Sequence, residues 1–144
     1  MKSSLLYTTL FVLLLSCFAK THAQTTPTIQ LPKKVVVFIP LEIDGAFEGN
    51  QYLLGNNNLP KTMLPGLDFY NGVLMAIDSL NKTNTPIEVR IIDTKQKNYS
   101  LANILSDSSI QNTALIISAV TNRADTKLIA DFALAHQTPM VSAT

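Results

Sequence analysis

Four short apolar runs stand out along the chain, each rich in β-branched residues and each separated from the next by polar turns. They predict β-strands over residues 35–39, 87–92 and 114–120, and a fourth from Pro139 onward. The first run, Val-Val-Val-Phe-Ile, is apolar without interruption. That pattern is typical of a strand buried on both faces, as in a parallel sheet.

The segments between these runs carry apolar residues at three- and four-residue spacing, which predicts amphipathic helices. The first helix spans Gly66 to Asn81, and the second runs from an N-cap at Asn98 to about Gln111. A third helix runs from Asn122 to His136. The residues expected to face inward are Leu67, Tyr70, Val73, Leu74, Ile77 and Leu80 in the first helix, Leu101, Ile104 and Leu105 in the second, and Leu128, Ile129, Phe132 and Ala133 in the third.

The resulting order is β-α-β-α-β-α-β, which predicts an α/β, doubly wound parallel sheet with right-handed crossovers. Its switch point, where the connections diverge, lies between the first and third strands. The segment from Leu41 to Pro65 is long, rich in Asn and Gly, and predicted to lack regular structure. Connections of that length are usually functional or mobile.

The N-terminus has the layout of a secretory signal peptide: a basic start at Lys2, an apolar run over residues 5–18, and small residues ending at Ala23. We therefore expect a signal peptide over 1–23, a polar linker over 24–32, and one domain over 33–144. Residues 14–17, Leu-Leu-Ser-Cys, also approximate a lipoprotein cleavage box, so lipidation of Cys17 is the alternative. Both routes predict export to the periplasm.

Removing the signal peptide changes the chemistry available to the 144-residue chain. It contains Lys2 and Lys20, so nine of the 11 basic residues remain against all 10 acidic ones, and the net charge falls from +1 to −1. A basic nucleic-acid-binding surface is therefore not expected. Cys17 and His22 are lost as well, which excludes a thiol nucleophile, a disulfide within the chain and a Cys/His zinc site. Neither a P-loop nor a dinucleotide fingerprint occurs, so we expect no cofactor.

The order and spacing of several short motifs resemble the N-terminal lobe of a type I periplasmic binding protein, the superfamily of leucine/isoleucine/valine-binding proteins. The similarity is greatest to a branch from Bacteroidetes-type bacteria, in which such a domain sometimes accompanies a peptidoglycan-binding LysM module. The motifs are Ile39-Pro40-Leu41, the helical run 67–81, Ile92-Asp93-Thr94, Ile116-Ile117-Ser118 and Pro139-Met140-Val141-Ser142.

Two features depart from that family. The third strand ends in Ser118-Ala119-Val120, where the family commonly has a glycine that allows close approach of a ligand. Such proteins also have two lobes, and the sequence ends at Thr144, within the first. The resemblance therefore implies a truncated first lobe.

Ligands of open parallel sheets bind beyond the carboxyl ends of the strands. Three loops are expected there, at residues 42–47, 120–123 and 142–144. In the resembled family they offer hydroxyls and backbone amides to a ligand carboxylate or similar group. The candidate ligand-binding residues are Ser142, Thr144, Ala143, Thr121, Asn122, Arg123 and Asp44.

Some of these residues have plain structural alternatives. Thr121 or Asn122 can cap the following helix, and Arg123 in its first turn is disfavoured by the helix dipole unless an anion binds there. Asp93 is expected to bond its own turn rather than a ligand. Glu42 and Asp44 could act as an acid/base pair, but solvation is the expected role.

The resemblance implies an exported, non-enzymatic solute-binding protein of the ABC-transporter or receptor type, binding a small polar ligand such as an amino acid. Its partners would be transporter membrane subunits or cell-wall proteins. The alternative is an envelope or peptidoglycan-associated interaction module that uses the same fold without transport, which the Ser118-Ala119-Val120 departure favours.

Overall fold

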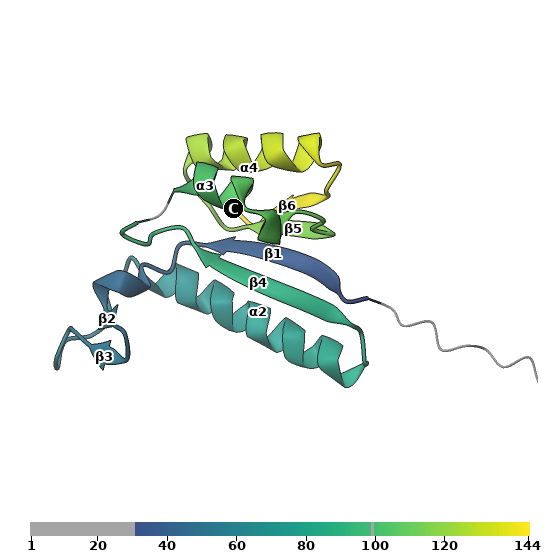
Figure 1. Ribbon diagram of the computed structural model, residues 1–144. Helices are drawn as coiled ribbons and strands as arrows, with labels where there is room; N and C mark the ends of the chain where they lie inside the picture. Colours follow the sequence, from purple (N-terminus) through teal and green to yellow (C-terminus); the bar gives the residue numbers. More distant parts are fainter. Residues whose placement is uncertain (1–30, 99) are drawn as a thin grey trace, which may run out of the picture. The chain divides into compact units, whose positions relative to one another are not determined.

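The computed structural model describes residues 31–98 and 100–144. The predicted signal peptide and residues 24–30 of the predicted linker lie outside the described residues. The centre of the structure is a parallel sheet of β1 (Lys33–Ile39), β4 (Ile87–Asp93), β5 (Leu115–Ser118) and β6 (Met140–Ser142). The strand order β4-β1-β5-β6 places the switch point between β1 and β5, as predicted (Figure 1).

Helices cover both faces of this sheet. Helix α2 (Leu64–Lys82) lies on one face, and α3 (Leu101–Ser106) and α4 (Arg123–Ala135) lie on the other (Figure 1). The predicted α/β class with a parallel sheet is confirmed, and this arrangement is compatible with a doubly wound fold. The expected unstructured segment after β1 contains more structure than predicted: a 3-10 turn η1 (Ile43–Gly45) and a hairpin of β2 (Phe47–Glu48) and β3 (Gln51–Tyr52).

Strand β1 is buried on both faces, which explains its uninterrupted apolar sequence. Val36 and Phe38 pack into a cluster with α3 and α4, whereas Val37 and Ile39 pack against α2. Strand β5 is different, because its residues alternate between half-buried and buried. Only the face of β5 that meets α4 is closed, where Ile116 is 1% exposed.

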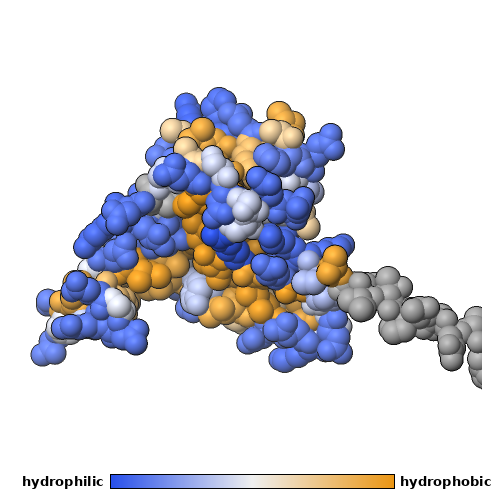
Figure 2. Space-filling model, viewed as in Figure 1, coloured by the Kyte–Doolittle hydropathy of each residue, from blue (hydrophilic) through white to orange (hydrophobic). Residues whose placement is uncertain are grey.

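Two of the predicted inward faces were too wide. Leu128 is 45% exposed, because the buried side of α4 is centred on Ile129 and Ala133, one turn apart. On α2, Leu74 and Leu80 are also exposed, and apolar residues reach the surface over this helix (Figure 2). The α2 residues that pack against this face of the sheet are Leu67, Phe69, Tyr70 and Val73.

The second predicted helix is interrupted. It begins after Ser100 rather than Asn98, because the Ser100 hydroxyl accepts a hydrogen bond from the Asn103 amide. It ends at Ser106, and a separate 3-10 turn η2 (Ser108–Ile110) follows, capped by Asp107. Serine and aspartate side chains compete for backbone amides in this way and so favour caps over helix interiors.

Asp107 joins η2 to strand β4. Its carboxylate accepts hydrogen bonds from the Ser109 amide, at 2.8 Å, and forms an ion pair with Arg90, which also donates to the Ser109 hydroxyl. The Ser109 amide and hydroxyl, followed by the charge of Arg90, hold the pKa of Asp107 below its usual value. A lowered folded-state pKa stabilises the fold above the unfolded-state pKa, near 3.9, and this contribution is lost as the pH falls through the folded value.

We therefore expect an NMR titration of the Asp107 carboxyl carbon to give a pKa below about 3.9. In Ser109→Ala the pKa should rise but stay below that value, because the variant keeps the Ser109 amide, which is the largest cause of the shift. A pKa of Asp107 at or above the usual value in the unmodified protein would contradict this assignment.

Candidate functional site

A small hollow lies at the carboxyl ends of β1, β5 and β6. We call it the strand-end hollow; its volume is about 180 Å³. Two of the three predicted ligand loops meet there, through Thr121 and through Ala143 with Thr144. The complete lining is Pro40, Pro65, Gly66, Phe69, Ala119, Thr121, Ala143 and Thr144.

The parallel sheet brings these loops together. The Ala119 amide donates to the Phe38 carbonyl at 2.9 Å, which holds the end of β5 beside the end of β1. The Ala143 amide donates to the Ser118 carbonyl at 2.8 Å and holds the end of β6 beside β5. The loops after β5 and β6 therefore form one wall of the hollow.

Ser142 and Thr144 differ in their placement. The Ser142 hydroxyl donates to the Thr144 carbonyl at 3.3 Å, so it bonds its own segment and does not line the hollow. The Thr144 hydroxyl lies on the lining and donates to the Val120 carbonyl at 3.4 Å. The hydroxyl of Thr121 makes no hydrogen bond with any other residue that the structure describes.

The opposite wall comes from α2, which sequence reasoning did not connect with the site. Phe69 packs against the core cluster on this side of the sheet and also lines the hollow. Gly66 packs so closely against β1 that an added Cβ would overlap the Pro40 carbonyl oxygen. The only sequence signal for this approach is a glycine directly after Pro65 at the start of a predicted helix.

Asn122 has the structural role that was considered as an alternative. Its side-chain oxygen accepts a hydrogen bond from the Ala124 amide at 2.9 Å and so caps α4. Arg123 is the exposed first residue of α4 and does not line the strand-end hollow. Thr121 and Asn122 also border a second, much smaller space with Thr94 and Lys95.

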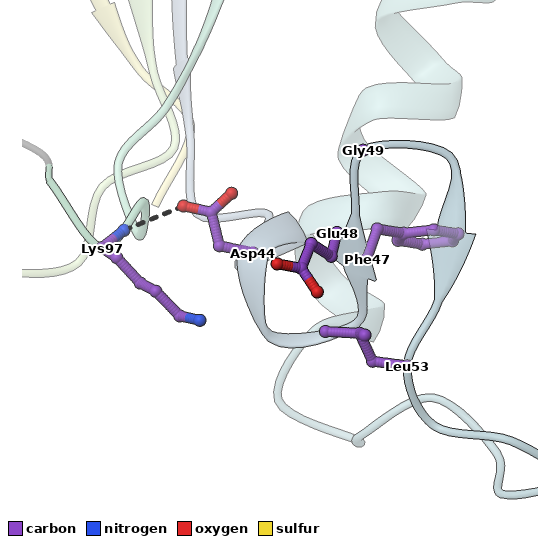
Figure 3. A pocket seen from close by; sticks show the side chains of 6 residues that line it. All are labelled: Asp44, Phe47, Glu48, Gly49, Leu53 and Lys97. Atoms are coloured by element: carbon purple, nitrogen blue, oxygen red, sulfur yellow. Dashed lines mark hydrogen bonds between the residues drawn. The ribbon is translucent and has the colours of Figure 1, made fainter.

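Asp44 is not brought to the strand-end hollow. It lines a separate space of about 320 Å³, the hairpin hollow, formed by η1, the β2–β3 hairpin and the segment after β4 (Figure 3). One Asp44 carboxylate oxygen accepts a hydrogen bond from the Lys97 amide at 3.0 Å. The expectation that all three loops line one site therefore fails for residues 42–47. The other lining residues are Phe47, Glu48, Gly49, Leu53 and Lys97.

Asp93 is the last residue of β4 and is only 3% exposed. It accepts a hydrogen bond from the Lys95 amide at 2.9 Å, which confirms the predicted bonding within its own turn. It also accepts hydrogen bonds from backbone amides of the segment after β1, which sequence reasoning did not foresee.

The strand-end hollow is chemically simple. Two threonines line it together with proline, alanine, glycine and phenylalanine, and the lining has no titratable side chain. Such a surface can hold a small molecule by apolar contact and a few hydrogen bonds. Across residues 31–98 and 100–144, no three acidic, histidine or cysteine side chains gather where they could hold a metal ion. Over the same residues, no helix has the length and apolar character that crossing a bilayer requires.

Comparison with known proteins adds no relative. No protein-family model matches the chain, and neither a curated protein nor a solved structure matches it.

Proposed function

We propose that the chain is the first lobe of an exported solute-binding protein, of the type I periplasmic binding superfamily, and that it holds a small polar ligand such as an amino acid. The observation that carries the proposal is the strand-end hollow. It lies at the β1/β5 switch point, and two loops far from α2 in sequence line it through Thr121 and Thr144.

The composition of the hollow supports this class of ligand. Phe69, Pro40 and Ala119 supply an apolar wall for an aliphatic or aromatic portion. Thr121 supplies a hydroxyl that can donate to a carboxylate or carbonyl oxygen, and the Thr144 hydroxyl, which donates to the Val120 carbonyl, can accept from a ligand N–H group. Ala119 stands where the resembled family commonly has glycine, so its methyl group keeps the ligand farther from the β5 backbone.

The size of the hollow predicts weak binding. Ligand sites usually enclose about 300–1,000 Å³ and cover most of the ligand. A hollow of about 180 Å³ falls below this range and leaves part of the ligand uncovered. In the proposed two-lobe protein a second lobe would cover that part by hinge closure. For this chain alone we expect a Kd near 1 mM, equivalent to about 4 kcal/mol.

Amide NMR spectra recorded during titration with a panel of amino acids test the proposal. We expect saturable shifts at residues 119–121 and 143–144 with at least one amino acid. Thr121→Val and Thr144→Val should each weaken that binding about fivefold, since one neutral hydrogen bond contributes about 1 kcal/mol. Thr85→Val, before β4 at the opposite end of the sheet, should leave the affinity unchanged. Absence of localised shifts across the panel, or a micromolar Kd, would contradict the proposed partly covered site.

The interaction-module alternative has one observation in its favour. The β2–β3 hairpin exposes Phe47, Tyr52 and Leu53, and the rings of Phe47 and Tyr52 lie 5.3 Å apart. Clustered exposed apolar residues mark interaction surfaces. Addition of soluble peptidoglycan fragments in the same NMR experiment separates the two functions: shifts confined to residues 47–53 would favour the envelope role over solute binding.

A further inference from the structure

Three successive backbone amides after β1 converge on one carboxylate. Leu41 donates to Asp93 Oδ1 at 2.9 Å, Glu42 donates to the same oxygen at 3.1 Å, and Ile43 donates to Oδ2 at 3.0 Å. Consecutive amides that point at one centre form an anion-binding concavity. Glu42 has a left-handed backbone, with φ of 57° and ψ of 36°, and this conformation turns the three amides to the same side.

The anion in this concavity comes from a distant part of the chain. Asp93 ends β4, more than 50 residues after Leu41, and the β1–β4 register places it opposite Ile39. A buried carboxylate is costly unless hydrogen bonds or a charge compensate it. Neither ion pair in the described part of the chain involves Asp93, so backbone amides supply the compensation. Including the amide of Lys95, four amides share its two oxygens.

We propose that residues 41–43 form a carboxylate-binding loop whose resident anion is the Asp93 side chain, and that this loop binds a free small carboxylate when the side chain is removed. Asp93 is then a positioning residue: it holds the segment that leads into η1 and the hairpin hollow. The inference does not rest on the proposed function. The occupied loop bears on the proposed function, because a ligand carboxylate cannot enter the loop after β1 and must bind on the Thr121 and Thr144 side.

Formate rescue of Asp93→Ala tests the proposal. The variant should have a lower Tm than the unmodified protein, and sodium formate should raise it saturably, recovering about half of the loss, because an anion that binds only the folded state stabilises it. Sodium chloride at equal ionic strength should not. Formate should also move the amide resonances of residues 41–43 back toward their original positions.

Asp44→Ala is the matched control. It removes a carboxylate from the same segment that accepts one amide hydrogen bond from residues 31–98 and 100–144 and borders an open hollow. Formate should not raise its Tm beyond the effect of chloride. A folded Asp93→Ala protein that responds to formate no more than to chloride would overturn the proposal.

If Asp93→Ala does not fold, Asp93→Asn tests whether the carboxylate holds the loop of residues 41–43. Asparagine keeps one acceptor oxygen but lacks the charge and the second oxygen. We expect its amide resonances to move at residues 41–43 and 95, while those around Ile129 stay in place. Unchanged resonances at residues 41–43 would show that the carboxylate does not hold this loop, and would overturn the proposal.

Discussion

Replacing Ile129 with alanine should lower the free energy of unfolding by about 3 kcal/mol, and the Tm by roughly 10 °C or more. Ile129 is fully buried and lies in the cluster that joins α4 to β1 and β5. Its neighbours include Phe38 and Ile116, which are held in the sheet by strands on both sides. They cannot move inward to fill the space. The variant therefore loses the transfer free energy of the removed atoms and also carries the cost of a cavity.

Leu128→Ala provides a matched control for that experiment. It removes an aliphatic side chain of the same size from the adjacent residue of the same helix, but Leu128 is 45% exposed. We expect a loss below about 1 kcal/mol. Urea unfolding followed by circular dichroism measures both variants. Equal losses at the two positions would mean that the buried face of α4 is centred elsewhere.

Replacing Gly66 with alanine should destabilise the protein by about 3 kcal/mol, although alanine is normally the better helix former. A Cβ at this position would overlap the Pro40 carbonyl oxygen and lie 3.0 Å from the Pro40 carbonyl carbon. Both are backbone atoms at the end of a buried strand, so no side-chain rotation relieves the overlap. The N-terminus of α2 must move away from β1, which also opens the strand-end hollow between Gly66 and Ala119.

Gly72→Ala tests the same substitution where space is available. Gly72 lies in the middle of α2, and an added Cβ would meet no atom within 4 Å. Here the helix propensity of alanine should stabilise the fold by about 0.5–1 kcal/mol. Opposite signs of the two changes in urea unfolding are expected. A stabilising effect of Gly66→Ala would show that α2 does not pack against Pro40 at this distance.

The strands could be predicted because their signal is local. An apolar β-branched run such as 35–39 has few alternatives to a buried strand, and the connection lengths then determine a parallel sheet. Helix faces were less accurate. Leu128 fits the apolar spacing of α4 as well as Ile129 does, and only the position of the neighbouring sheet decides which of the two is buried.

The candidate site could be predicted only in part, because some of its contacts follow from the strand order and others depend on tertiary packing. Loops that follow neighbouring parallel strands must emerge at one edge, so the meeting of Thr121 with Thr144 follows from the strand order. The separation of Asp44 does not follow, because it depends on the backbone turn at Glu42 and the contact with Lys97. The role of Phe69 depends on how closely α2 approaches the end of β1. This close approach is possible because Gly66 has no Cβ.

The central position of β1 has a consequence for the order of events during synthesis. β1 precedes every other strand of the sheet in the chain, yet Val35 pairs with Val89 on one side and with Leu115 on the other. A ribosome must therefore translate past Leu115 before the most apolar segment of the described residues can close both of its edges. Until then the nascent chain carries a strand with at least one unpaired edge, which makes it prone to aggregation. We therefore expect a factor that binds nascent chains at the ribosomal exit tunnel to shield β1 until β5 has emerged.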